Sequence, residues 1–255
     1  HGNGGGGNRI EGDFVNGPDG VINISGGEAV VQGTSLIGNA LLHIVDASTF
    51  QNQGLIQLTS RTGLFSRDGA ILTADGGPIV NASGGIIASL TGANGGDRIV
   101  DAPVLNQGTV QAVDASLTFN DQLTNAGQIQ IGRSKSLNAS SGLQLTDHGT
   151  VMLEVDGANG SVAGRLLAGA SPTLAGELNL VAANGATFSD QRTFIPVTYT
   201  DLQGQFDAII TTNLAETITI DPDYADSGLR ITATVPGAIT PPDLPPVNPF
   251  DEFRD

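Results

Sequence analysis

The sequence contains no cysteine, no tryptophan, one methionine and two tyrosines among its 255 residues. The lack of cysteine excludes disulfide bonds, thiolate nucleophiles and zinc sites with cysteine ligands. Because aromatic residues make up only 4% of the chain, a buried core must consist mainly of Val, Leu, Ile and Ala side chains. Such side chains suit thin layers between closely spaced backbones.

Basic residues are also scarce. The chain has 10 Lys and Arg against 26 Asp and Glu, for a net charge of −16, and Lys135 is the only lysine. This acidic balance argues against nucleic-acid binding, which requires basic side chains to neutralise phosphates, and against polybasic attachment to anionic membranes. No run of about 18 apolar residues is present, so we expect no transmembrane helix.

What the sequence does contain is an internal repeat. An Asn or Asp is followed within a few residues by Gly and then by alternating apolar residues, as in the stretch from Asn106 to Ala112. Glycine permits tight corners, Asn and Asp bond their own backbone in turns, and alternation is the strand signal. We expect a structural turn ladder formed by Asn16, Asn52, Asn81, Asn106, Asn125 and Asp147.

The spacings between these six positions are 36, 29, 25, 19 and 22 residues. The shortest spacings match one solenoid coil, which places Asn106 and Asn125 at equivalent corners of adjacent coils. The longer spacings fit either one coil with an inserted loop or an extra coil with a degenerate motif. On this basis we expect roughly seven or eight coils between residues 10 and 165, stacked about 4.8 Å apart.

The repeat predicts an all-β fold, a right-handed parallel β-helix (solenoid) with a C-terminal β cap or sandwich-like module. A β-sandwich is the alternative, because Asn-x-Gly turns also connect hairpins. Four segments are expected along the chain. They are a flexible Gly-rich lead-in over residues 1–9, the solenoid over 10–163, the cap module over 164–236 and a Pro-rich extended tail over 237–255.

Residues 14–155 resemble the passenger regions of bacterial autotransporters and filamentous-haemagglutinin-type adhesins, which carry loose repeats of the form Asn-x-Gly-x-Ile-x-Val. Residues 164–236 resemble the segment that ends many such passengers. The matching stretches are Leu174–Leu180, Thr193–Val197, Leu202–Phe206 and Leu229–Val235. The resemblance implies a secreted protein of the bacterial cell surface with a structural or adhesive role.

Catalytic motifs are sparse, and we expect no catalytic, cofactor-binding or metal site and no enzymatic activity. His43 lies in a strand-like run and is expected to be a satisfied wall residue, and His148 is expected to be solvated in a turn. Asp221, Asp223 and Asp226 could hold a calcium ion with their carboxylates, with a Pro-containing turn as the alternative interpretation.

The alternative function is a carbohydrate-active β-helix enzyme, either a polysaccharide lyase or a hydrolase. Its candidate residues are Arg67, Asp68, Asp97, Arg98 and Asp101. The favoured hypothesis is a non-catalytic surface rod that binds a host or environmental glycan or protein. Copies could also associate end to end into a head-to-tail extracellular filament, because a parallel solenoid leaves strand edges at both ends.

Overall fold

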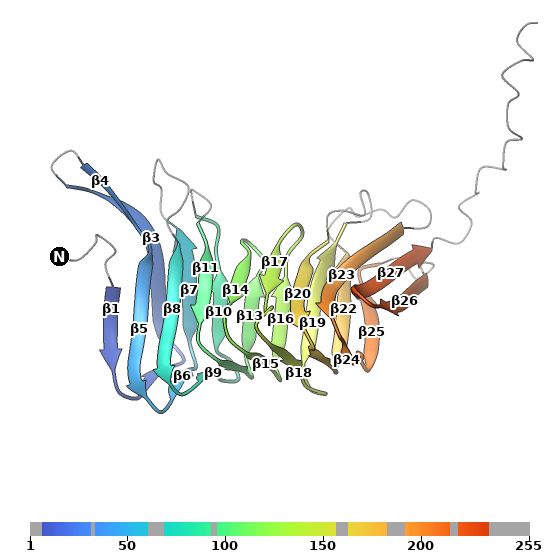
Figure 1. Cartoon of the computed structure of the whole chain (residues 1–255), viewed down its shortest axis with the longest axis horizontal. Helices are drawn as coiled ribbons and strands as arrows, with labels where there is room; N and C mark the ends of the chain where they lie inside the picture. Colours follow the sequence, from blue (N-terminus) through green and yellow to red (C-terminus); the bar gives the residue numbers. More distant parts are fainter. Residues whose placement is uncertain are drawn as a thin grey trace, which may run out of the picture.

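The chain folds into a stack of three-stranded coils, each contributing one strand to each of three sheets (Figure 1). This computed structural model describes residues 7–31, 34–60, 69–92, 96–156, 163–182, 192–214 and 219–234. The expected Pro-rich tail and residues 1–6 of the expected lead-in lie outside the described residues, whereas residues 7–9 belong to strand β1. Within the described residues all regular structure is β, and the parallel β-helix prediction is confirmed.

Sheet A has ten strands. In spatial order they are β1 (Gly7–Glu11), β5 (Ala40–Ala47), β8 (Ala70–Gly76), β11 (Arg98–Asp101), β14 (Leu117–Phe119), β17 (Ser136–Asn138), β20 (Arg165–Ala170), β23 (Arg192–Thr200), β27 (Gly228–Thr234) and β26 (Thr219–Ala225).

Sheet B has eight strands. They are β2 (Phe14–Asn16), β6 (Phe50–Asn52), β9 (Ile79–Asn81), β12 (Val104–Asn106), β15 (Leu123–Asn125), β18 (Leu143–Leu145), β21 (Thr173–Leu174) and β24 (Gln203–Gly204). Sheet C has nine. They are β25 (Ala208–Thr212), β22 (Glu177–Ala182), β19 (Thr150–Val155), β16 (Gln128–Ile131), β13 (Thr109–Ala112), β10 (Ile86–Ser89), β7 (Leu55–Ser60), β3 (Val21–Val31) and β4 (Thr34–Gly38).

Eight coils therefore stack along the rod, because sheet B receives one strand from each coil. Six of them, from β1 to β19, fall between residues 7 and 155, which is fewer than the seven or eight expected up to residue 165. The reason is that the described parts of the long spacings add no extra coil. Their additional residues lie between sheet C of one coil and sheet A of the next, for example at β4, between β3 and β5.

The interior is a set of aliphatic rows. In sheet C the register stacks one inward residue per coil, namely Ile22, Ile56, Ile87, Val110, Ile129, Val151, Leu178 and Ile209. The six residues from Ile56 to Leu178 are fully buried. Each buried side chain contributes roughly 1.5–3 kcal/mol relative to exposure, so this row alone is a major source of stability.

The parallel stack continues beyond the expected boundary at residue 164. Strands β20, β21 and β22 form a seventh coil, and β23, β24 and β25 form an eighth, all pairing in parallel with the coil before. The architecture changes only at β26 and β27, an antiparallel hairpin that joins β23. The cap is thus this hairpin over residues 219–234, and residues 165–212 belong to the solenoid.

Longer strands without Asn-x-Gly corners suggested a separate module in this region. The strands of this region nevertheless stack as coils, because parallel stacking depends on the register between neighbouring strands. Residues other than Asn-x-Gly can form the corners between them. Leu229, Ile231 and Ala233 of the hairpin are fully buried, and the Phe206 amide donates to the Tyr224 hydroxyl oxygen at 3.1 Å. The hairpin therefore covers part of the last coil.

Candidate functional site

An asparagine ladder runs through the corner between sheets B and C. The Nδ2 of each Asn donates to the Oδ1 of the Asn in the next coil. The four steps are Asn16 to Asn52 (2.7 Å), Asn52 to Asn81 (2.7 Å), Asn81 to Asn106 (2.7 Å) and Asn106 to Asn125 (2.6 Å). Asn52, Asn81, Asn106 and Asn125 are completely buried, and Asn16 is 5% exposed.

The same amide nitrogens also reach backbone carbonyl oxygens of the corner. Asn52 Nδ2 lies 3.2 Å from Gly54 O and 3.2 Å from Ile86 O. These contacts satisfy buried polar groups that would otherwise cost free energy. The corner glycine is required because a Cβ on Gly108 would lie 2.2 Å from the Gly85 carbonyl oxygen of the preceding coil.

The ladder ends at Asn125, and the expected sixth member does not join it. The register places Leu145 opposite Asn125, and Leu174 and Gly204 occupy the corresponding positions of the last two coils. Asp147 lies in the turn beyond, with its side chain 74% exposed and one carboxylate oxygen 3.6 Å from Nδ1 of His148. This corner is as long as those after Asn16 and Asn81, but its ladder position, the last residue of the sheet B strand, is Leu145, and Asp147 comes two residues later.

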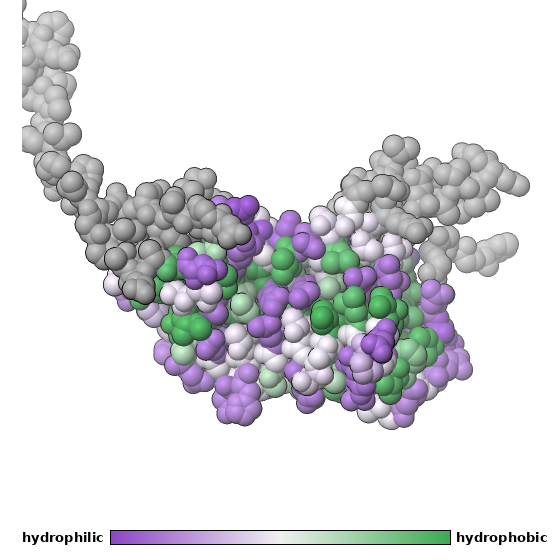
Figure 2. Space-filling view, turned by 180° about the vertical axis from the view of Figure 1, so that it is seen from behind, coloured by the Kyte–Doolittle hydropathy of each residue, from purple (hydrophilic) through white to green (hydrophobic). Residues whose placement is uncertain are grey.

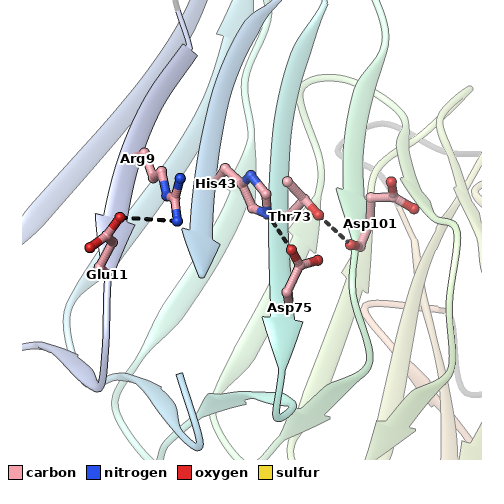
Figure 3. A network of polar contacts seen from close by, with 6 residues as sticks. All are labelled: Arg9, Glu11, His43, Thr73, Asp75 and Asp101. Carbon is pink, nitrogen blue, oxygen red and sulfur yellow. Dashed lines mark hydrogen bonds and ion pairs between the residues drawn. The ribbon is translucent and has the colours of Figure 1, made fainter. Parts of the chain in front are cut away.

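A strip of polar side chains lies on the outer face of sheet A in the first four coils (Figure 3). The Nε2 of His43 is 2.7 Å from Oδ2 of Asp75, and Thr73 Oγ1 donates to the Asp101 carbonyl at 3.0 Å. Arg9 pairs with Glu11 at 3.0 Å. His43 is one-third exposed and held by Asp75, as a paired wall residue is expected to be. Such exposed pairs typically contribute little to stability.

Of the candidate enzyme residues, Asp97 and Arg98 line one hollow of about 360 Å³, and Asp101 does not join them there. The Arg98 side chain points inward and is buried, donating to Leu90 O at 2.8 Å, to Ser60 Oγ at 3.1 Å and to Gly96 O. Burial lowers the pKa of Arg98, and the neighbouring Asp97 opposes this effect. Asp101 lies on the outer face, and Arg67 and Asp68 lie outside the described residues.

The expected calcium candidates are spread along the cap hairpin. Asp221 and Asp223 are exposed on β26, Asp223 lies 3.8 Å from Arg230, and Asp226 is in the turn that follows. Within the described residues no group of three or more His, Asp or Glu side chains is placed to hold a metal ion.

The outer faces change character along the rod. One outward row of sheet C starts with Val21, Leu55 and Ile86 and continues as Thr109, Gln128 and Thr150. Seen from behind, apolar residues gather toward the N-terminal end of the rod, whereas polar residues are more frequent in its middle (Figure 2). Val15 and Val21 are 56% and 63% exposed, so the first coil presents apolar surface.

Sequence analysis did not identify a hollow at the corner between sheets C and A. Its volume is about 380 Å³, and it is lined by Ser134, Lys135, Ser136, Ala163, Arg165 and Leu167. Lys135 and Arg165 are 30 positions apart in the sequence and meet only because their coils stack. In the sequence, the one feature that could have pointed to this hollow is that Lys135 is the only lysine of an acidic chain.

The family-model scan and the search of curated proteins both find no match for this chain. Among the described residues, none forms a helix long and apolar enough to cross a membrane.

Proposed function

We propose that the chain is a non-catalytic structural or adhesive rod of a secreted or bacterial cell-surface protein. The observation that carries this proposal is the uninterrupted parallel stack of eight coils with an internal asparagine ladder. Aliphatic rows and a hydrogen-bonded amide row both run along the rod axis. At about 4.8 Å per coil, the stack makes a rod roughly 34 Å long. Such a rod holds outward side chains in fixed rows, which suits repeated weak contacts with an extended ligand.

The placement of Arg98 favours this proposal over a polysaccharide lyase or hydrolase. A catalytic base or acid must be free to reach the substrate, whereas the Arg98 guanidinium is held by the carbonyl groups of Leu90 and Gly96 and by the Ser60 hydroxyl. Its neighbour Asp101 lies on a different surface, where Thr73 donates to its backbone carbonyl oxygen.

Two measurements on the full chain separate adhesion from catalysis. Beads coated with the chain should attach to host cells or to glycan-coated surfaces, and soluble chain should compete for that attachment. Polymeric neutral and acidic glycans incubated with the chain should show no new reducing ends or unsaturated products. Turnover of any polymer would reject the non-catalytic proposal, and failure of soluble chain to compete would reject adhesion.

End-to-end assembly of copies is a second element of the proposal. Strands β1 and β2 are edge strands at the N-terminal end of sheets A and B, and β24 and β25 are edge strands at the other end of sheets B and C. Free edges pair readily with further strands. Light scattering of the full chain should show a mass that rises with concentration, and a constant monomer mass would contradict assembly.

A further inference from the structure

The hollow lies at the corner between sheets C and A, where the number of residues between successive strands varies most from coil to coil. Lys135 ends a turn that follows β16, and Arg165 begins β20 in the next coil. The Arg165 amide donates to the Lys135 carbonyl oxygen at 2.9 Å, so the two residues are fixed on adjacent coils. Variable corners on a rigid scaffold are where solenoids place binding residues.

The charge of this hollow is unusual for the molecule. Both of its charged lining residues are cations, although the chain has a net charge of −16. Arg9, Arg133 and Arg230 each have a carboxylate within 4 Å, at 3.0, 2.9 and 3.8 Å respectively. No ion pair joins Lys135 or Arg165 to a carboxylate of any described residue. The register pairs Arg165 with Ser136, the residue after Lys135, so the two cations lie on neighbouring coils without a carboxylate partner among the described residues to offset their repulsion.

Two further hollows adjoin this one. One has a volume of about 360 Å³ and shares Ser134 and Lys135, and the other has about 550 Å³ and shares Leu167. The first is lined by the carboxylates of Asp97 and Asp114 as well as by Arg98 and Lys135, so its charges balance and it offers an anion no net attraction. The second has an uncharged and mainly apolar lining, with the hydroxyl and amide groups of Asn138, Ser140, Thr198 and Thr200 among its residues.

The three hollows therefore form a groove along the outer side of sheet A, with two cations at its centre and hydroxyl and amide groups toward its C-terminal end. Hydroxyl and amide groups both donate and accept hydrogen bonds, as do sugar hydroxyls. A carboxylate or sulfate matches paired ammonium and guanidinium donors. These features together define a ligand that is extended, rich in hydroxyls and negatively charged.

We propose that the groove binds an acidic polysaccharide. The carboxylate or sulfate of one sugar lies between Lys135 and Arg165, and neighbouring sugars extend past Asn138 toward Thr198 and Thr200. This inference rests on the proposed adhesive role, for which it names the ligand class. Since Tyr199, the aromatic residue in the lining of these two hollows, is buried and offers no exposed ring face for stacking, the charged contact dominates affinity and salt weakens binding.

The test is titration of the full chain with three short oligosaccharides, one carboxylated, one sulfated and one neutral, followed by calorimetry or NMR. At low salt an acidic oligosaccharide should bind and the neutral one should not. The carboxylated and sulfated ligands distinguish the two possible anionic groups. Lys135→Gln combined with Arg165→Gln should weaken binding by at least about tenfold, since each removes a charge-assisted contact.

The matched control is Arg9→Gln combined with Arg230→Gln, which changes the net charge by the same amount at two arginines already paired with carboxylates. This control should bind with unchanged affinity, and both double variants should keep the thermal midpoint of the parent. Equal weakening by both double variants, equal affinity for the neutral ligand, or no binding of either acidic ligand would overturn the inference. Bead attachment that survives Lys135→Gln and Arg165→Gln would separate the two proposals, since adhesion would stand without this groove.

Discussion

At the residue scale, each interior ladder asparagine uses its side-chain amide in both directions along the rod. Asn106 accepts from Asn81 through Oδ1 and donates to Asn125 through Nδ2. Asn125 accepts from Asn106 but donates only to the Gly127 carbonyl oxygen at 3.2 Å, because Leu145 follows it in the stack. Asn106 and Asn125 therefore occupy equivalent corners of adjacent coils, but Asn106 is hydrogen-bonded to two ladder asparagines and Asn125 to one.

Replacing Asn106 by Leu should lower the free energy of unfolding more than replacing Asn125 by Leu. The first change removes the side-chain acceptor of Asn81, which keeps only the Gly85 and Thr109 carbonyls, and leaves the Asn125 Oδ1 without its donor, so we expect a loss of roughly 2–4 kcal/mol. The second removes only the side-chain acceptor of Asn106, which keeps the Gln128 carbonyl, and places Leu next to Leu145, for a loss of about 1–3 kcal/mol. Urea unfolding measures both, with exposed Gln144→Ala as the control. The reverse order of the two losses would contradict the ladder geometry.

Asp13 ties the first two coils together at the corner between sheets A and B. Its Oδ1 accepts from the Thr49 amide at 3.0 Å and from Ser48 Oγ at 2.9 Å. These bonds, above all that from Thr49, lower the pKa of Asp13 below its ordinary value of 3.8.

Because the folded-state pKa is lowered, the contribution of ionised Asp13 is fully present above pH 3.8 and is lost as the pH falls through the lowered value. Acidification below pH 3.8 should therefore lower the protection factor of the Thr49 amide, which compares its observed exchange rate with the intrinsic rate at the same pH. Asp13→Asn should give the lower protection factor already at neutral pH. NMR-detected exchange measures both effects, and protection of Thr49 that is identical in the two proteins at neutral pH would rule out this role.

At the element scale, the three corners of a coil differ in how much their length can vary. The corner between sheets B and C holds the ladder and its close glycines, whereas the corner between sheets C and A differs greatly in length from coil to coil. Val113 and Asp114 of the latter corner are exposed. A longer loop at such a corner raises mainly the entropic cost of closing the loop on folding, and this cost grows slowly with loop length.

A Gly-Ser-Gly-Ser insertion between Val113 and Asp114 should cost less than about 1 kcal/mol of unfolding free energy. The same insertion between Ala126 and Gly127 should cost roughly 2 kcal/mol or more, because Ala126 and Gln128 bond backbone carbonyls of the preceding coil at 2.8 Å. Denaturant unfolding of the two insertion variants provides the comparison. Equal costs at the two corners would show that the ladder corner is not the more constrained.

At the scale of the whole molecule, the two ends of the rod are different. Hairpin β26–β27 extends sheet A at the C-terminal end and buries Leu229 and Ile231. At the N-terminal end the first coil presents Val15 and Val21 to solvent. A hairpin that buries apolar side chains over the last coil protects it from pairing with other chains.

Leu229→Asp combined with Ile231→Asp should open the hairpin and expose the last coil. The variant should then show a mass by light scattering that rises more steeply with concentration than that of the parent. Arg230→Gln, whose side chain is exposed on the same strand, is the matched control and should behave as the parent. A double variant with the parent's mass and thermal midpoint would show that the hairpin does not protect this end.

The sequence by itself determined the type of coil. Alternating aliphatic residues and Asn-x-Gly corners are local signals, and they suffice to predict a parallel solenoid and to place Asn106 and Asn125 one coil apart. Only the tertiary structure decided the rest, because register depends on which strand pairs with which. It settled that the described parts of the long spacings add no extra coil, that Leu145 and not Asp147 follows Asn125, and that the coils run on through β25. Lys135 and Arg165 meet for the same reason, since stacking brings together residues that no local pattern connects.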